Sequence, residues 1–540
     1  MSSLETQVLI IGGGVTGTGL ARDLALRGVQ SIVVEKGDIN AGASGANHGL
    51  LHSGARYVST DPATAIECRK EGKLLKRLAS HCIEETGGLF AAVEGDDENY
   101  AADFPHLCSR CGISVQTLDA KEARELEPAL SEKVIAAYLV EDAFINPFQL
   151  SLENISHARR LGTTLLLHTK VIGFTRSDKH IQAVCLLNTK TGEQTTVEAE
   201  QVVNAAGAWA GEVAALAGAP IAMLYSKGSI LVTQTRLAKR VVSRLRLPSD
   251  GDILAPAGTV SLLGTTSVRT DSLGDIRPTM EEADLLVDEG AALIPVLKSA
   301  RYIRAFAGVR PLIGTRTNGG DRSLSRGLVL LDHARNGLEN FTTITGGKLS
   351  TFRLMAEKAA DLVCRRLGVS NPCLTRTEPL PSTEACRWSE PGVAPRLWMK
   401  QPDPEDTLLC ECEMVPRSVI DGIIASIREH KGKPDLKTIG LRSRIGKGPC
   451  QGTFCGARVT AHMYERGELH LDQGLTNLKD FLRERWKGER PVARDVQLSQ
   501  AALKEAFYCG LCCLELEASE KVRLFGKRPE RSSSKGIKSP

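Results

Sequence analysis

The stretch QVLIIGGGVTGTGLARDLALRG, residues 7–28, decides the fold. Its first part, QVLIIG (7–12), is a short apolar run typical of a buried strand. Residues 15–28 then carry apolar side chains at helical spacing and end in Gly28, which suits the end of a helix. SIVVEK (31–36) predicts a second strand. Strand, helix and strand together indicate the opening unit of a nucleotide-binding α/β fold.

Three glycines stand where this unit turns from strand to helix. Gly12, Gly14 and Gly17 form the motif G-x-G-x-x-G. The first glycine allows a tight turn, the second lets a pyrophosphate approach the backbone, and the third lets helix and strand pack closely. Glu35 ends the second strand, where a carboxylate can accept hydrogen bonds from ribose hydroxyls. A glycine-rich turn without a ligand would not need all of these features, so we expect a dinucleotide.

Three further segments decide between FAD and a nicotinamide cofactor. They are NAGASGANHGLLHSGARY (40–57), VVNAAGAW (202–209) and TITGGKLSTFR (343–353). Each brings small residues and backbone amides toward a ligand, and one nucleotide contacted from such distant segments favours an FAD-dependent oxidoreductase. The expected cofactor-binding residues are Gly12, Gly13, Gly14, Gly17, Glu35, Ser44, His48, Gly49, Gly207, Gly346 and Gly347.

Periodicity predicts most of the other elements. The expected helices are 62–82, 119–127, 147–161, 279–298 and 348–368, and the expected strands include 163–175, 181–187, 327–333 and 341–347.

Four cysteines with paired spacing lie far downstream. LLCECEM contains Cys410 and Cys412, and GKGPCQGTFC contains Cys450 and Cys455. The pattern is C-x-C, 37 residues, then C-x₄-C. Four thiolates suit zinc or an iron–sulfur cluster, although a one-residue gap is less usual for structural zinc. A [2Fe–2S] cluster, zinc and a site without metal all remain open on spacing alone.

The composition of this chain of 540 residues indicates its cellular compartment. It has no run of about 18 apolar residues and no signal peptide, so we expect a cytoplasmic protein whose membrane contact is peripheral. Residues 521–540 hold seven Lys or Arg and one Glu and lack apolar periodicity, which predicts a solvated basic tail. No nucleic-acid partner is expected.

Several segments resemble those of flavin-dependent glycerol-3-phosphate dehydrogenases. They are IIGGGVTGTGLARDLALRG, ANHGLLHSGARY, VVNAAGAW, AFAGVRPL and ITGGKLSTFRLMAE. LLCECE, CQGTFC and FLRERWKG extend the resemblance to the A subunit of the anaerobic enzyme. The resemblance implies FAD, oxidation of sn-glycerol 3-phosphate to dihydroxyacetone phosphate, and electron delivery to quinone through partner subunits. One partner would be a membrane-associated iron–sulfur subunit, which would hold this chain at the inner face of the cell membrane.

The cysteine region resembles the small helical [2Fe–2S] domain named after a bacterioferritin-associated ferredoxin (BFD). Its 37-residue gap is slightly longer than that resemblance suggests. The expected fold class is therefore α/β. An FAD-binding Rossmann-like domain of the glutathione-reductase or D-amino-acid-oxidase type is interleaved with a mixed-sheet substrate domain, and a BFD-like [2Fe–2S] domain follows. The expected boundaries are 1–370 for the oxidoreductase, 371–406 for a linker, 407–465 for the [2Fe–2S] domain, 466–520 for a helical segment and 521–540 for the tail.

A phosphate substrate needs Arg or Lys in a buried pocket, because the guanidinium group matches phosphate oxygens. The resemblance makes Arg310 the first candidate, and Arg326, Arg56 and Tyr57 are further candidates for the substrate pocket.

Oxidation of a secondary alcohol also needs a base for the hydroxyl proton. His52 is the expected base, with His48 and His333 as alternatives. Lys348 is expected to polarise the substrate oxygen or to stabilise reduced flavin. The expected catalytic residues are His52, Arg56 and Lys348.

Two other functions remain open. One is an amine or amino-acid dehydrogenase of the same fold, and the other is a non-catalytic FAD and iron–sulfur electron-transfer subunit. Phosphate-binding arginines argue against the first, and the presence of His52, Arg310 and Lys348 argues against the second.

Overall fold

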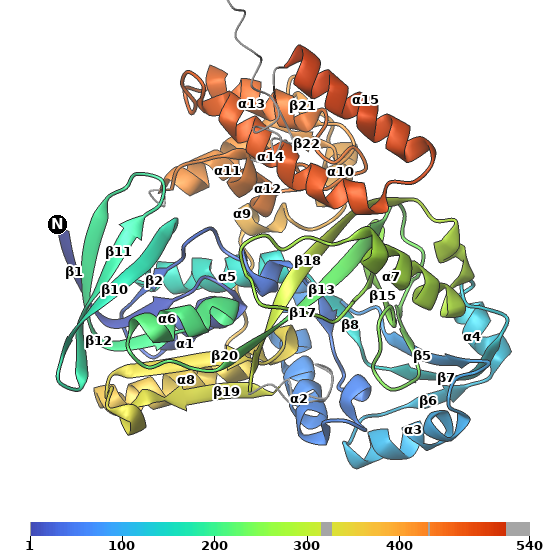
Figure 1. Ribbon diagram of the computed structural model, residues 1–540, viewed down its shortest axis with the longest axis horizontal. Helices are drawn as coiled ribbons and strands as arrows, with labels where there is room; N and C mark the ends of the chain where they lie inside the picture. The colour runs from blue at the N-terminus through green and yellow to red at the C-terminus, as the bar shows by residue number, and fades with distance from the viewer. Residues whose placement is uncertain (1, 315–326, 430–431, 513, 515–540) are drawn as a thin grey trace, which may run out of the picture.

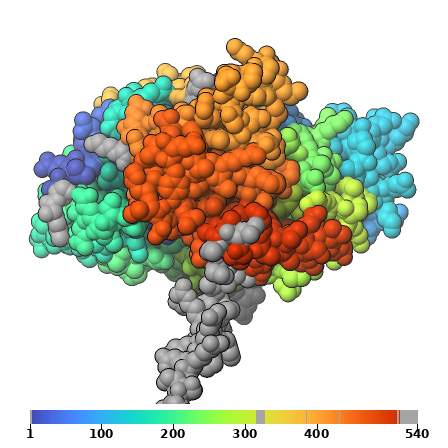
Figure 2. Space-filling view, turned by 90° about the horizontal axis from the view of Figure 1, so that it is seen from above, coloured from blue at the N-terminus to red at the C-terminus, as the bar shows by residue number. Residues whose placement is uncertain are grey.

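The computed structural model describes residues 2–314, 327–429, 432–512 and 514. Two sheets stand side by side, and helices from the C-terminal part of the chain lie across them (Figure 1). The space-filling view from above shows these helices, coloured orange to red, spread over the middle of the molecule (Figure 2).

The nucleotide-binding sheet is built on β1 (Ser2–Ile11), α1 (Val15–Leu26) and β2 (Ser31–Val34). Its strand order is β10-β11-β12-β1-β2-β9, with β20 beside β12 and β19 beside β20. The other strands are β9 (Thr164–Leu166), β10 (Thr169–Ser177), β11 (His180–Asn188), β12 (Gln194–Asn204), β19 (Leu328–Asp332) and β20 (Phe341–Gly346). The predicted opening unit is confirmed, and β1 begins earlier than its apolar run because it pairs in parallel with β12 from Ser2 onward.

Helices cover this sheet. On one face α1 packs with α5 (Pro147–Arg160) and α8 (Phe352–Leu367), while α6 (Ala210–Leu216) lies against the sheet near β10. Helix α8 was expected to begin at Lys348. It begins instead at Phe352, because Gly347 has a φ of +68° and a short 3-10 turn, Leu349–Thr351, intervenes. Lys348 is therefore held in a turn next to the sheet edge.

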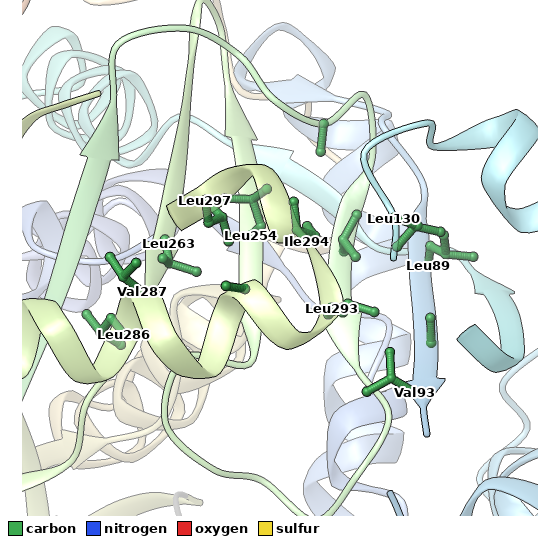
Figure 3. Packing of buried hydrophobic residues seen from close by; sticks show 14 of the residues in the cluster. Leu89, Val93, Leu130, Leu254, Leu263, Leu286, Val287, Leu293, Ile294 and Leu297 are labelled. Carbon is green, nitrogen blue, oxygen red and sulfur yellow. The ribbon is translucent and has the colours of Figure 1, made fainter. Parts of the chain in front are cut away.

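The second sheet has the order β17-β13-β16-β15-β14-β5-β7-β6, and β18 pairs with β13. Its strands are β5 (Gly88–Val93), β6 (Gln116–Leu118), β7 (Val134–Val140), β13 (Met223–Thr233), β14 (Val241–Arg244), β15 (Ile253–Ala257), β16 (Val260–Gly264), β17 (Val268–Thr270) and β18 (Tyr302–Ile313). Helix α7 (Met280–Leu293) starts at a capping box between Thr279 and Glu282. Its Leu286 and Val287 pack on strand residues such as Leu263 (Figure 3).

Short elements connect the two sheets. A small sheet of β3 (Leu50–Leu51), β8 (Ala143–Ile145) and β4 (Ile83–Glu84) joins them. The helices here are α2 (Pro62–Leu78), α3 (Glu98–Arg110) and α4 (Ala120–Leu126). Periodicity did not reveal α3, which contains Pro105.

The C-terminal part folds around the predicted cysteine region. Its elements are α9 (Glu384–Arg387), α10 (Val393–Lys400), β21 (Leu408–Cys410), β22 (Val415–Pro416), α11 (Arg417–Glu429), α12 (Leu436–Arg442), α13 (Cys455–Glu465), α14 (Gln473–Glu489) and α15 (Val496–Leu511). We call residues 407–512 the C-terminal module. Arg442 binds Asp38, directly after β2, with N–O distances of 2.8 and 3.0 Å. No helix in the described ranges is both long and apolar enough to cross a bilayer.

A buried ion-pair network ties α8 to α2. The Arg353 guanidinium binds Glu71 at 2.6 and 2.7 Å and Glu357 at 2.6 Å, and all three side chains are about 5% exposed. The network lies beneath the segment that carries Lys348. It therefore holds one wall of the functional site in place.

We predict that Arg353→Met lowers the free energy of unfolding by about 3–5 kcal/mol, because two buried carboxylates lose their shared cation. Arg376→Met is the matched control, since Arg376 pairs with the same Glu357 but is 60% exposed, and it should cost less than about 1 kcal/mol. Urea denaturation followed by far-UV circular dichroism measures both. Equal losses in the two variants would contradict the role of burial.

Candidate active site

The glycine turn is packed as tightly as the motif requires. Gly12 has a φ of +119°, and its amide donates to the Val34 carbonyl at 2.8 Å. A Cβ on Gly17 would lie 2.0 Å from the Gly12 carbonyl oxygen. Only glycine fits at that position, and the close contact places the N-terminus of α1 at the end of β1.

Glu35 is bonded into this turn. Its carboxylate accepts the Gly13 and Gly37 amides, each at 2.7 Å, and burial raises its pKa. The Ser44 hydroxyl accepts the Val15 amide at 2.9 Å, at the start of α1. Glu35 and Ser44 both line the large cavity that opens beside the turn. A carboxylate held there can still accept a ribose hydroxyl.

The cavity has a volume of about 700 Å³ and is walled by distant segments of the chain. That volume suits a cofactor with a small substrate. The predicted residues that line it are Gly12, Gly14, Glu35, Ser44, His48, His52, Arg56, Tyr57, Gly207, Arg310, Gly346, Gly347 and Lys348.

Three of the predicted cofactor-binding residues do not line the cavity. Gly13 and Gly17 belong to the turn behind the wall, as described above. Gly49 is a packing residue, because a Cβ there would lie 2.5 Å from the Ile145 carbonyl oxygen. Arg326 lies outside the described residues.

His52, Tyr57 and Lys348 form a contact group on one wall. The Tyr57 hydroxyl is 3.4 Å from His52 Nε2, and the two rings meet edge to face. The Lys348 ammonium lies 4.2 Å from the centre of the Tyr57 ring. Tyr57 therefore sets the spacing between an imidazole and a cation that face the same cavity.

Two arginines reach the cavity from different elements. Arg56 is anchored by Asp252 at 2.8 Å, while its Nη1 is buried and has no hydrogen-bond partner within the described chain. Arg310, on β18, donates to the Thr266 carbonyl at 3.1 Å and to the Thr265 hydroxyl. It lies across Gly228, where a Cβ would approach its Nη2 to 2.4 Å. Both guanidinium groups are thus fixed beside space for an anion.

The two alternative bases differ in place. His48 lines the cavity, where burial and then the charges of Arg310 and Arg56 lower its pKa to about 3. It is neutral at physiological pH. His333 begins instead the 3-10 turn His333–Asn336 that follows β19. It is 2% exposed, with Nε2 2.9 Å from the Thr343 hydroxyl, and burial lowers its pKa.

Comparisons with known proteins agree with this cavity. A family model described as FAD dependent oxidoreductase matches residues 7–362. The A subunit of the anaerobic glycerol-3-phosphate dehydrogenase of Escherichia coli K12 is 41% identical, over 96% of this chain and 99% of that protein. Its counterpart from Haemophilus influenzae is 38% identical, over 95% and 94%.

The chain belongs to the family of A subunits of anaerobic glycerol-3-phosphate dehydrogenase, which are FAD-dependent oxidoreductases. A solved glycerol-3-phosphate dehydrogenase from Bacillus halodurans, in complex with FAD, has the same fold. Its TM-score is 0.61 at 20% identity, over 91% of this chain and 96% of that one. The expected FAD-dependent α/β fold is confirmed, and the glycine cradle, Glu35 and the cavity volume fit FAD.

Lys36, Trp209 and Lys437 are among the cavity residues that escaped prediction. The Lys36 ammonium lies 3.4 Å from the centre of the Trp209 ring, and burial lowers the pKa of Lys36. Both residues line the cavity, as does Lys437 of α12. Lys36 and Trp209 stand within or beside quoted motifs and could have been included. Lys437 had no local signal, because only the docked C-terminal module brings it to the cavity.

The four predicted cysteines are gathered in the C-terminal module. Cys412 Sγ lies 3.7 Å from Cys410 Sγ and 3.6 Å from Cys450 Sγ. Hydrogen bonds with Cys412 and Cys455 lower the pKa of Cys450 to about 2. A Cβ on Gly448 would lie 2.6 Å from the Cys412 sulfur, so the loop backbone rests on that thiol. Over the described residues, however, no group of three or more His, Cys, Asp or Glu is arranged to hold a metal ion.

We predict that Gly17→Ala weakens FAD binding at least tenfold, because the new methyl group would force the turn away from α1. The ratio of flavin to protein absorbance in the purified protein measures the loss. Gly422→Ala is the control, since Gly422 lies in α11 with no atom within 4 Å of its added Cβ. If Gly17→Ala kept its full complement of FAD, the tight turn would not be what holds the cofactor.

Proposed function

We propose that the protein oxidises sn-glycerol 3-phosphate to dihydroxyacetone phosphate, with FAD as the hydride acceptor. The observation that carries this proposal is that an imidazole, an ammonium and two guanidinium groups share one cavity with the glycine turn. The names of the E. coli and H. influenzae relatives support the same substrate.

The two arginines are proposed to bind the phosphate. Arg56 offers a buried, unused donor at Nη1 while Asp252 holds its other side, so a phosphate oxygen would complete its hydrogen bonds. Arg310 reaches the same cavity from β18. Tyr57 is proposed to contact the substrate as well, through the hydroxyl that faces His52.

His52 is proposed to be the base. It takes the proton from the C2 hydroxyl on Nε2 while the C2 hydrogen leaves as hydride, and the C2–O bond becomes a carbonyl. When bound, FAD supplies the two-electron acceptor. Lys348 stabilises the negative charge that develops on the substrate oxygen or on reduced flavin. Tyr57 keeps the ammonium and the imidazole apart, so that both can approach the same substrate atom.

The cysteines are proposed to hold a [2Fe–2S] cluster in a domain of residues 407–465, with a linker before it and a helical segment after it. The end of that expected segment, 515–520, lies outside the described residues. Two sulfurs on one tetrahedral metal atom at about 2.3 Å would lie ~3.8 Å apart, close to the observed spacings, so these distances suit zinc as well as iron. Backbone amides point to the sulfurs, from Glu413 to Cys410 and from Gly452 to Cys450. Such donors are typical of iron–sulfur sites.

The relatives are each named as one lettered component of a dehydrogenase, which supports a multi-subunit enzyme. We propose that electrons leave the flavin through the cluster to partner subunits, including a membrane-associated iron–sulfur subunit, and then reach quinone. This chain would sit at the inner face of the cell membrane through those partners.

An anaerobic titration with sn-glycerol 3-phosphate tests the function. We expect the flavin absorption bands to bleach, followed by loss of the broader absorbance of an iron–sulfur cluster. If the flavin stayed oxidised with this substrate but bleached with an amine or amino acid, the amine dehydrogenase function would replace ours. If no small substrate bleached it, the chain would be an electron-transfer subunit.

We predict that His52→Asn lowers kcat about 100- to 10,000-fold. Protonated His52 cannot act as a base, so kcat/KM of the unaltered enzyme should fall toward acid pH. The variant should lose this acid limb. His48→Gln should keep the limb, because the pKa of His48 is already near 3. Loss of the limb in His48→Gln alone would move the base to His48.

A further inference from the structure

Three basic side chains meet at the seam between the C-terminal module and the oxidoreductase domain. Arg304 comes from β18, Lys447 from the loop before Cys450, and Arg485 from α14. Within the described part of the chain, none of the three forms an ion pair. Each lies over an aromatic ring instead, at 5.8 Å (Arg304 on Phe306), 4.5 Å (Lys447 on Phe148) and 4.8 Å (Arg485 on Phe481).

The neighbouring carboxylates are already engaged. Glu413 binds Arg444 at 3.1 Å, and Glu489 binds Lys504 at 2.7 Å. The Nε atoms of Arg304 and Arg485 are buried and find no hydrogen-bond acceptor among the described residues. A guanidinium cannot discharge by losing its proton, and a buried charge is normally compensated. Burial lowers the pKa of Lys447 well below its usual value, so the positive charge of the seam is that of the two arginines, and it lacks an anion.

The four cysteines are the nearest source of that anion. A Cβ on Gly446 would lie 2.9 Å from Arg485 Nε, and the Gly446 amide donates to the Cys455 sulfur. Burial and then the charge of Arg304 lower the pKa of Arg485 to about 9, whereas Cys455 acts in the opposite direction. Arg485 thus lies against the loop that carries two of the thiols.

The seam is separated from the cofactor cavity by a few packed residues. Phe148, which the Lys447 ammonium covers, lies against Gly45, where a Cβ would be 3.3 Å from its ring. Ser44, the next residue, lines the cavity. Arg304 belongs to the strand that also carries Arg310, and α14 packs closely on that strand at Gly488 (Figure 1).

We propose that Arg304 and Arg485 are the counter-charges of the four-thiolate centre and raise its reduction potential. The inference rests on the cluster of the proposed function. A cluster held by four thiolates is anionic and gains one more negative charge when reduced, so nearby cations in a low-dielectric seam favour the reduced state. Arg304 comes from the oxidoreductase domain. The reduction potential of the cluster would therefore reach its full value only when the C-terminal module is docked on that domain.

The test is an EPR-monitored redox titration of the full chain, purified without oxygen. Arg485→Gln should lower the equilibrium constant for one-electron reduction of the cluster at least tenfold, which is about 59 mV. Arg304→Gln should shift it in the same direction, and Arg485→Lys should retain most of the original potential. The Arg304 variant also keeps the test open if Arg485→Gln fails to fold.

Arg458→Gln is the matched control. Arg458 lies on α13 three residues from Cys455, but it is 43% exposed and paired with Glu411 at 2.8 Å, so solvent screens it. If the reduction potential shifted as much in Arg458→Gln as in Arg485→Gln, the proposed role of the buried arginines would be wrong. Unchanged potentials in Arg304→Gln and Arg485→Gln with a normal cluster signal would also contradict that role. If the unaltered protein showed no cluster signal, both the cluster and this inference would fail.

Discussion

The rest of the site depends on the contact between Gly17 and the Gly12 carbonyl oxygen. No side chain fits between them, so α1 starts directly at the end of β1. Glu35 then accepts the Gly13 amide, which joins β2 to the same turn. Strand, turn, helix and acid form one rigid unit, against which the more distant walls of the cavity are placed.

Three buried or partly buried arginines differ in the number of carboxylates that neutralise them. Arg353 is paired with two carboxylates, and we assign it a structural role. Arg56 has one, and its unused donor faces the cavity, which suits a ligand. Arg485 has none and lies beside thiols. The fewer carboxylates an arginine binds within the chain, the more its guanidinium group is available for a ligand or a cluster.

Local patterns were sufficient for the parts of the fold whose causes are local. The apolar run of β1, the helical spacing of α1 and the glycines between them lie within 28 residues, and they predicted the nucleotide-binding fold. The choice of FAD needed the three more distant segments, 40–57, 202–209 and 343–353. His52, Arg310 and Lys348 came with motifs, and they do line one cavity. Their roles remain predictions until the variants are measured.

Other features escaped because their causes are not local. Gly49 was expected to bind the cofactor, but it is a glycine because the Ile145 carbonyl approaches it. Lys437 and Arg304 show no pattern in their own segments. Each acquires its environment only when parts of the chain more than a hundred residues apart come together.

The pairing of Asp38 with Arg442 bears on how far this enzyme is modular. Asp38 is 1% exposed and follows the strand that ends beside Glu35, yet its partner lies some four hundred residues downstream. Lys437, on the same helix as Arg442, reaches the cavity itself. A fragment that ended after α8 would keep every motif of a flavoenzyme. The Asp38 carboxylate would nevertheless lose its partner Arg442, and the cofactor cavity would lose Lys437. The C-terminal module therefore forms part of the wall of the cofactor cavity. Replacing it by another domain would change that wall.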